Sequence, residues 1–313
     1  MKKLNLRFFK KLDKKIDKMM DMDWTPSFNL FSDILVEELK SLAGYEPREQ
    51  KLSLAQRNEI AAENLKTHLD EKPEEREKEK VSFPPEFSWL DVDGKNYVTS
   101  VKNQGFCSSC VAFGTLAVVE TMMRIKEKKP VNTKKTDTIP GLSEAQLFFK
   151  SPGFSMGPNS EDTHNCKTGW EIDDALRYLV EPGVVPEDVF PYELEDKSQP
   201  MPDGWKEKTT KITGFMPLNS HSNMKQWISK VGPLVTAMTI KADLVFYGKG
   251  IYSHIFGPAL GGHCVTVVGY NDEYQAWLCK NSWSEHWGEE GFFWIKYGEC
   301  GIDAEMWGIT GIS

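Results

Sequence analysis

Cys110 stands directly before a long apolar run, and this placement favours a nucleophilic thiolate. The segment QGFCSSC, residues 104–110, leads into residues 110–124, which are apolar nearly all round and predict a buried helix. Unpaired backbone N–H groups and the positive end of the dipole at a helix N-terminus stabilise a thiolate over a thiol. Because the thiolate is the reactive form of cysteine, this placement is typical of covalent catalysis.

The Cys-x-x-Cys spacing of Cys107 and Cys110 has other uses, as a redox dithiol or as half of a zinc site. A zinc site needs a second close pair of ligands, whereas His263 and Cys264 are adjacent and chelate poorly. A redox pair is expected after the first strand of a βαβ unit, which the sequence does not indicate here. The motif alone leaves a nucleophile and a redox dithiol open.

Two downstream residues supply the partners that a cysteine nucleophile needs. His263 begins one predicted strand, and Asn281 ends the next strand 18 residues later. Antiparallel strands joined by a turn can bring such positions side by side. An imidazole would then pair with the thiolate, the Asn281 carboxamide would fix its tautomer, and Trp283 would cover that bond.

The elements that would position these residues fall into a helical half followed by a β-rich half that begins at about residue 208. Apolar spacing predicts helices, and short β-branched and aromatic runs between turn residues predict strands. Besides residues 110–124, the predicted helices are 7–22, 33–43, 143–150 and 170–180, and the predicted strands are VTVVGY, QAWLCK and GFFWIKYG.

Composition excludes several classes of protein. The chain has 313 residues, a net charge of −8 and 40% apolar residues, which is enough apolar residue to form a core. No apolar run of about 18 residues predicts a membrane span, and the acidity argues against a nucleic-acid binder. Six cysteines are too few for a disulfide-dense scaffold.

The charge divides the chain into two parts. Residues 1–20 carry +6 and residues 21–80 carry −6, so residues 81–313 carry the whole −8. Nine of the ten residues 71–80 are charged, and Pro84 and Pro85 then forbid helix. The sequence predicts a domain boundary, and a site of proteolytic cleavage, at residues 76–84.

Four segments of residues 83–313 together resemble the papain family of cysteine peptidases. They are VTSVKNQGFCSSCVAF, LSEAQLF, GGHCVTVVGY and KNSWSEHWGEEGFFWIKYG. The resemblance implies an α+β fold with a cleft between two lobes, a helical left lobe at about 83–206 and an antiparallel, β-barrel-like right lobe at about 207–313. It implies that Cys110 lies on the first lobe and that His263 and Asn281 lie on the second.

The resemblance also implies residues around the nucleophile. Gln104 would donate its amide to the oxyanion beside the Cys110 backbone N–H, a contact whose loss costs roughly 10²–10³ in rate. Cys107 would form a disulfide with Cys166, and Ser108 would lie at the cleft. No metal and no cofactor are expected.

Substrate contacts are implied as well. Gly169 would let the substrate backbone pair with the cleft wall, where a side chain would block the approach. Trp287 would lie on the leaving-group side, and Trp283 and Ala237 would line the cleft.

The ending GECGIDAEMWGI resembles cathepsin B and places Asp303 at the base of the pocket for the second residue before the scissile bond. A carboxylate there favours Arg or Lys in the substrate. No counterpart of the cathepsin B occluding loop is visible between Gly169 and Trp205. The resemblance therefore implies an endopeptidase with an open cleft.

Departures from the family pattern favour an alternative, a catalytically weak or inactive papain-fold protein that binds peptides. Ser108 replaces a Gly, where it would narrow the cleft or serve as the helix N-cap. Val111 replaces a Trp and Thr168 replaces another Gly. Three cysteines have no counterpart to pair with: Cys264, Cys279 and Cys300.

Residues 1–80 are expected to form an inhibitory helical prosegment, and residues 81–313 the catalytic domain. Ser27 to Asp33 resembles the family's propeptide motif, with Asn29, Phe31 and Asp33 matching and Ser27 replacing a Gly. A neutral prosegment with a basic end would dock on the acidic enzyme partly through charge. Protonation of Asp and Glu between about pH 5 and 4 would then promote maturation.

The expected partners are peptide or protein substrates and the prosegment in the cleft, with no nucleic acid and no membrane span, and the chain is expected to be a monomer. The start MKKLNLRFFKKLDKK is not a readable secretory signal. The resemblance implies a lysosomal, vacuolar or secreted protein, whereas the missing signal leaves retention inside the cell open.

Overall fold

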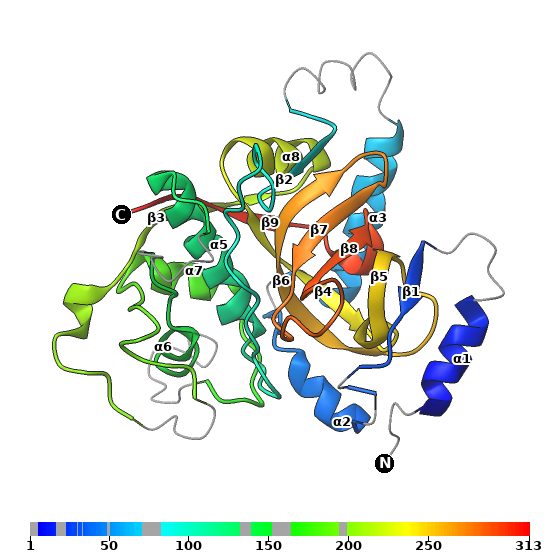
Figure 1. Cartoon of the computed structure of the whole chain (residues 1–313), viewed down its shortest axis with the longest axis horizontal. Coiled ribbons are helices and arrows are strands. Elements are labelled where there is room, and N and C mark those ends of the chain that lie inside the picture. Colours follow the sequence, from blue (N-terminus) through cyan, green and yellow to red (C-terminus); the bar gives the residue numbers. More distant parts are fainter. Residues whose placement is uncertain are drawn as a thin grey trace.

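The computed structural model places a helical lobe beside a lobe of strands, as the α+β prediction requires (Figure 1). Helices α5, α6 and α7 lie to the left, and most of the strands lie to the right. The described residues are 6–16, 23–29, 31–32, 34–48, 51–70, 83–131, 139–151, 164–193 and 199–313.

The left lobe is built around α5 (Cys110–Glu127), which is buried on nearly every face through Met122. This confirms the predicted buried helix, which runs three residues further than expected. Helix α6 (Glu144–Phe149) begins at Ser143, whose hydroxyl accepts a hydrogen bond from the Gln146 backbone N–H. Together with α7 (Ile172–Val180) these helices surround the core of this lobe.

The strands of the described residues form one sheet, in the order β1-β5-β8-β7-β6-β4-β9-β3, with β2 also pairing β6. All pairs are antiparallel except β5 with β8. The bounds are β1 (Trp24–Pro26), β2 (Glu86–Ser88), β3 (Ile212–Leu218), β4 (Leu234–Lys241), β5 (Tyr247–Tyr252), β6 (Ala259–Asn271), β7 (Ala276–Lys280), β8 (Phe292–Lys296) and β9 (Met306–Ile312). The three predicted strands correspond to β6, β7 and β8.

The two lobes exchange segments. Strand β2, before the helices in sequence, pairs with β6 of the right lobe, and Phe83 and Trp89 lie in the right-lobe core. Strands β3 and β9 run across to the left lobe, where Ile212 and Ile309 join the helical core (Figure 1). Helix α8 (His221–Lys230) packs on β6, β2 and β4. The lobes are therefore tied together by strands as well as by the contact between them.

The prosegment runs along the right lobe before it crosses between the lobes (Figure 1). It contains α1 (Leu6–Ile16), strand β1 paired with β5, α2 (Val36–Leu39) with the 3₁₀ turn η1 (Lys40–Leu42), and α3 (Leu54–Asp70). Parts of several predictions lie outside the described residues. These are residues 17–22 of the first helix, Asp33, the charged stretch 71–80, and residues 76–82 of the boundary.

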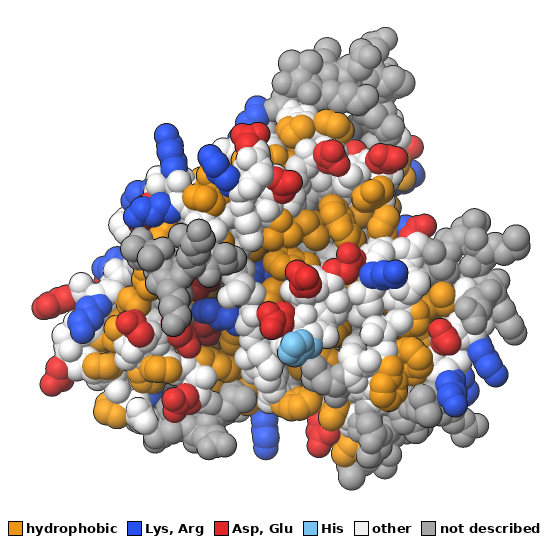
Figure 2. Space-filling model, viewed as in Figure 1, with side chains coloured by type: hydrophobic (Ala, Val, Ile, Leu, Met, Phe, Trp, Pro, Cys, Tyr) orange, Lys and Arg blue, Asp and Glu red, His pale blue; other side chains and the backbone are white. Residues whose placement is uncertain are grey.

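One face of the molecule mixes all types of side chain. Figure 2 shows hydrophobic side chains exposed over the right-lobe strands, with acidic and basic side chains scattered around them. The cationic side chains on this face are not gathered into the continuous basic patch that nucleic acid requires. No helix among the described residues combines the length and the apolar character needed to cross a membrane.

Candidate active site

Cys110 is the first residue of α5, and its thiol faces the right lobe. Its sulfur accepts a hydrogen bond from the Cys264 backbone N–H at 3.3 Å, so the residue after His263 touches the thiol. The N-cap is Ser109, so the prediction that Ser108 serves as the cap is wrong by one position. The Ser109 hydroxyl bonds the Tyr192 hydroxyl at 2.7 Å and makes no cap hydrogen bond, because it points away from the helix.

His263 and Asn281 lie side by side, as the strand prediction required. His263 Nε2 is 2.8 Å from Asn281 Oδ1, and this oxygen also accepts the Ser282 backbone N–H at 2.9 Å. The oxygen is therefore an acceptor, which assigns the proton of the neutral imidazole to Nε2. Trp283 covers the pair, with its ring centroid 4.9 Å from that of His263. Nδ1 makes no hydrogen bond of standard geometry to a described residue.

Burial decides the charge state of the thiol and the imidazole. It raises the pKa of Cys110 to about 12, against hydrogen bonds from nearby backbone N–H groups. It also lowers the pKa of His263 to about 4, an effect that the hydrogen bond to Asn281 and the nearby Leu42 backbone oppose. In this closed state burial therefore favours the neutral form of both groups, and desolvation opposes the thiolate that the helix N-terminus favours.

The side-chain amide of Gln104 lies beside the N-terminus of α5. Its Nε2 donates to the carbonyl oxygens of Cys107 at 2.7 Å and Leu42 at 3.3 Å, and its Oε1 accepts from the Ser282 hydroxyl at 2.6 Å. The Leu42 carbonyl belongs to the prosegment. A peptide carbonyl thus already lies on the amide that the sequence predicts as an oxyanion donor.

Residues 42–48 of the prosegment lie between the two lobes and are bonded to both. The Gly44 and Tyr45 N–H groups donate to the Gly262 carbonyl at 2.9 and 3.1 Å on the right lobe. The Trp170 N–H donates to the Gly44 carbonyl at 2.8 Å, and the Glu46 N–H donates to the Trp170 carbonyl at 3.2 Å on the left. The cleft wall expected to pair with substrate backbone therefore pairs with the prosegment.

Glycines make this close approach possible. A Cβ at Gly44 would clash with the Ser108 carbonyl oxygen, and a Cβ at Gly169 would clash with the Glu46 side chain. Both positions therefore need a residue without a side chain. The prediction that Gly169 admits a peptide to the wall agrees with this contact.

The matching residues of the propeptide motif dock on the far side of the cleft. Asn29 Nδ2 donates to the Val245 carbonyl at 2.8 Å, and Phe31 packs edge-on against Trp283 at 5.7 Å. The same carbonyl accepts the Trp287 indole N–H at 3.0 Å. Trp287 is fully buried, and it supports Trp283 at 4.9 Å.

Asp303 does not line the cleft, so its predicted role is wrong. It is fully buried, and its Oδ2 lies 2.7 Å from His221 Nε2 and accepts the Trp277 indole N–H and the Gly298 backbone N–H at 3.0 and 2.8 Å. These contacts hold Oδ2 inside the right lobe, while the buried Oδ1 has no hydrogen-bond partner among the described residues. Glu305, two residues later, is only half-buried, and its backbone carbonyl accepts a hydrogen bond from a prosegment side chain.

That side chain is Arg57 of α3, which is almost completely buried against β4. It donates to the carbonyl of Ala237 at 2.9 and 3.2 Å, to the Thr236 hydroxyl at 3.1 Å and to the carbonyl of Glu305 at 3.0 Å. Ala237, predicted as a cleft residue, thus contributes its backbone oxygen. Burial raises the pKa of Glu305, and the charge of Arg57 opposes that rise.

Cys107 and Cys166 form the disulfide that the resemblance implied. The four remaining cysteines, Cys110, Cys264, Cys279 and Cys300, are free and buried. The redox alternative required Cys107 to pair with Cys110, and the structure does not have that pairing. The described residues also contain no group of three His, Cys, Asp or Glu side chains placed to hold a metal ion.

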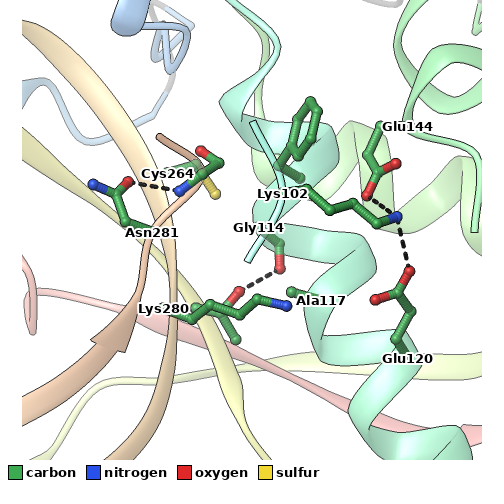
Figure 3. Close-up of a pocket in the computed structure, with 11 residues that line it drawn as sticks. Lys102, Gly114, Ala117, Glu120, Glu144, Cys264, Lys280 and Asn281 are labelled. Carbon is green, nitrogen blue, oxygen red and sulfur yellow. Dashed lines mark hydrogen bonds and ion pairs between the residues drawn. The ribbon is translucent and has the colours of Figure 1, made fainter. Parts of the chain in front are cut away.

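The sequence analysis missed a buried ionic cluster behind the site (Figure 3). Lys102 Nζ lies 3.1 Å from Glu120 and 2.7 Å from Glu144, and Thr99 joins Glu120 to Lys280 with bonds of 2.6 and 2.9 Å. A cavity of about 10 Å³ lies beside the cluster. Lys280 directly precedes Asn281, so the cluster supports the strand end that carries the carboxamide. The available signal was Glu120, the first charged residue of α5, which lies within the part of the helix that is buried on nearly every face.

Comparisons with known proteins agree with this geometry. Residues 83–310 match the model of the papain family cysteine proteases. The chain is 31% identical to pro-cathepsin H of Bos taurus over 230 residues, 71% of this chain and 63% of the relative, so it spans under two thirds of that relative's length. It is 30% identical to cathepsin B-like CP3 of Giardia intestinalis, over 67% of this chain and 69% of the relative.

Solved structures of proforms share the fold. Digestive procathepsin L2 of Tenebrio molitor has a TM-score of 0.69 and 25% identity, over 97% of this chain and 89% of that one. Procathepsin B S9 of Trypanosoma congolense has a TM-score of 0.67 and 20% identity, over 98% of this chain and 97% of that one. The match therefore extends over the first eighty residues as well as over the two lobes.

Proposed function

The chain belongs to the papain family of cysteine proteases, and from this we propose that it is the zymogen of a cysteine endopeptidase. The observation that carries the proposal is the Leu42 carbonyl. It lies on the Gln104 amide, between Cys110 and the His263–Asn281 pair, where the carbonyl of a scissile bond would lie. The site holds a peptide in the closed state, and removal of residues 1–80 would open it to substrates.

In the opened enzyme the thiol proton moves from Cys110 Sγ to His263 Nδ1, the nitrogen that the Asn281 bond leaves free. Sγ attacks the substrate carbonyl carbon, and the oxyanion receives hydrogen bonds from Gln104 Nε2 and the Cys110 backbone N–H. The C–N bond then breaks as Nδ1 gives its proton to the leaving amine. A thioester remains on Cys110.

Water completes the reaction. His263 Nδ1 takes a proton from the water as its oxygen attacks the thioester carbonyl, again with the oxyanion on Gln104. The C–S bond breaks, the carboxylic acid product leaves, and the proton on Nδ1 and the thiolate on Cys110 restore the ion pair. Asn281 holds the ring in the same orientation through both half-reactions.

The proposed preference for a basic residue at the second position before the scissile bond rests on Glu305 and no longer on Asp303. Arg57 supports it, because its guanidinium occupies a pocket formed by Ala237, Thr236 and Glu305. A substrate Arg or Lys would find the same acceptors once α3 leaves. The predicted absence of an occluding loop includes residues 194–198, which lie outside the described residues, and stays a prediction.

Covalent labelling with a peptidyl epoxide tests the proposal on enzyme freed from its prosegment. We expect stoichiometric labelling of the wild type and of Cys279→Ala, which removes a buried free cysteine away from the cleft, and none of Cys110→Ala. Hydrolysis of a fluorogenic peptide should follow the same pattern. Peptide binding without labelling or hydrolysis would favour the alternative, a papain-fold protein that binds peptides. Ser108 and Val111, which replace a Gly and a Trp of the family pattern, are the residues that favour this alternative.

A further inference from the structure

Three carboxylates stand at the start of α7, immediately after the cleft-wall residue Trp170. Glu171 is the N-cap residue, and Asp173 and Asp174 lie in the first turn. Asp173 is 4% exposed and Asp174 is 1% exposed. Acidic side chains are almost never so buried unless they are paired.

Their closest cationic partners come from the prosegment. The Arg48 guanidinium pairs with Asp174, Lys51 Nζ lies 3.0 Å from Asp173, and the Arg48 backbone N–H donates to Glu171 Oε1 at 3.0 Å. Lys51 Nζ also lies 5.7 Å from the centroid of the Trp307 ring, a cation–π contact on the same surface. The site therefore already holds two basic side chains of a peptide.

The mature enzyme itself supplies little compensation. Of its own cations, Arg177 approaches Asp173 at 3.9 Å, through a side chain that is 62% exposed. Asp173 Oδ1 is buried and has no hydrogen-bond partner among the described residues. Prosegment removal would expose the three carboxylates to water and break their ion pairs with Arg48 and Lys51. Arg177 would then be the cation of the described lobe residues that lies within 4 Å of them, and a cationic ligand would restore the lost pairs.

The position of the carboxylates fits an extended peptide in the cleft. Trp170 bonds the peptide backbone at Gly44 and Glu46, and the next residue of the wall is Glu171. The prosegment passes Trp287 on the leaving-group side before it reaches Gln104 and then Trp170, so it crosses the cleft in the direction opposite to a substrate. Arg48 lies up to about 13 Å of extended chain beyond Gly44, on the side where a substrate has the residues before its scissile bond. The Arg57 guanidinium lies near the same part of the cleft. The charges of Lys51 and Asp173 both act on the pKa of Glu305, whose backbone carbonyl binds Arg57.

We propose that Glu171, Asp173 and Asp174 form a further subsite of the mature enzyme that binds an Arg or Lys three to five residues before the scissile bond. The substrate class is then polypeptides with a basic stretch ahead of the cleavage site. This inference rests on the proposed peptidase function, and the prosegment residues Arg48 and Lys51 occupy the subsite until maturation.

Paired fluorogenic peptides test the subsite on the matured enzyme. The peptides share every residue except the fourth and fifth before the scissile bond, which are Arg in one and Gln in the other. We expect wild-type kcat/KM to be about tenfold higher for the Arg peptide at low salt, and the ratio to fall as salt is raised. Asp174→Asn should bring the ratio close to one. Glu171→Gln, which removes no side-chain cap bond, is a second variant with the same expectation.

Glu181→Gln is the matched control, because Glu181 is exposed on the same lobe and pairs with Lys211. It should leave the wild-type ratio unchanged. The subsite proposal would be overturned if the Arg-to-Gln ratio of kcat/KM were near one in the wild type, or if it were equal in the wild type and Asp174→Asn. Hydrolysis of the Gln peptide in the same experiment would still support the peptidase function. Absence of both hydrolysis and Cys110 labelling would instead overturn the peptidase function, and the subsite with it.

Discussion

At the scale of single residues, the position of Cys110 at a helix N-terminus does not by itself determine whether its thiol is protonated. The sequence places a thiol at a helix N-terminus, where thiolate is favoured, and the closed structure buries it with its imidazole. Burial favours the neutral forms of the thiol and the imidazole, because it excludes water from both. Opening the cleft thus creates the nucleophile as well as exposing it.

Alkylation against pH tests this change of state. Burial raises the pKa of Cys110 to about 12 in the closed chain, so the thiol holds its proton below that pH and iodoacetamide should react slowly from pH 5 to 9. In the opened enzyme the same residue should react rapidly throughout this range. Mass spectrometry of the Cys110 peptide gives both rates. Equal rates in the two forms would contradict the expectation.

Residue roles were predictable where a role is local to a segment. Cys110 begins α5 and Asn281 directly follows β7, as the sequence indicated, so their approach to His263 followed from two antiparallel strands and one helix. The prediction that His263 begins its strand is wrong, because β6 begins at Ala259 and His263 lies within it. Asp303 failed because two acids, Asp303 and Glu305, lie in an irregular stretch between η5 (Glu299–Gly301) and β9. Which acid turns inward is decided by His221 on α8, a contact that spacing alone does not contain.

At the scale of elements, the crossing segment 42–48 inhibits through backbone contacts that depend on Gly44. A Val at this position would push against the Ser108 carbonyl oxygen, and the segment would have to leave the wall. We expect Gly44→Val to give the uncut chain at least tenfold more peptidase activity than the wild type, measured before any processing is detected on a gel. Lys40→Ala is the control, because this exposed side chain pairs only with nearby Glu37. If the uncut chains of both variants were equally inactive, the backbone contacts of Gly44 would not be what closes the cleft.

The carboxylate Glu171 gives the docked prosegment a pH dependence with a definite sign. Burial raises its pKa from 4.5 to about 7, so the docked form binds its proton more tightly than the open form. This contribution favours docking at low pH and is lost as pH rises from about 4.5 through 7. It opposes the acid-promoted maturation predicted from overall charge, which stays a prediction.

Glu171→Gln isolates this contribution, because glutamine resembles the protonated acid at every pH. Between pH 5 and 8 we expect prosegment affinity in trans to fall more steeply for the wild type than for Glu171→Gln. The slope of affinity against pH for each variant comes from surface plasmon resonance, with a peptide of residues 6–70 binding to immobilised enzyme that carries Cys110→Ala. Parallel slopes would assign the pH dependence to other groups.

Elements were predictable in proportion to how much apolar pattern they carry. Helix α5 is apolar on nearly every face and was found with its start correct. The sequence did not predict α3 as a separate helix within the generally helical first eighty residues, because its buried face includes the polar residues Arg57 and His68. Those side chains are buried by acceptors and rings on the enzyme, which the helix sequence does not display.

At the scale of the whole molecule, the buried ionic cluster joins the lobes behind the cleft. Lys280 comes from β7, and Lys102, Glu120 and Glu144 come from the left-lobe side (Figure 3). Glu120→Gln would leave the half-buried Lys102 with Glu144 alone and would remove the carboxylate that Thr99 links to the buried Lys280. We expect a loss of about 3–5 kcal/mol in the free energy of unfolding, measured by urea denaturation of the Cys110→Ala chain.

Glu127→Gln provides the comparison, because Glu127 ends the same helix in solvent and pairs only with Lys129. Its loss should cost no more than about 0.5 kcal/mol. Similar losses in the two variants would mean that the cluster does not hold the lobes together.

The prosegment acts as a bivalent ligand built into the chain. One arm, α1 with β1, binds the right lobe through Phe8 and Trp24, and the other arm, α3, binds it through Arg57. Residues 42–48 join the two arms, and the chain after α3 joins both arms to the lobes, so each arm has a high effective concentration at its site. A cut in residues 42–48 would leave α3 attached, and only the arm of α1 and β1 would become subject to dilution. A single cut at the predicted boundary, residues 76–84, would instead make both arms subject to dilution together, although neither arm had lost a contact.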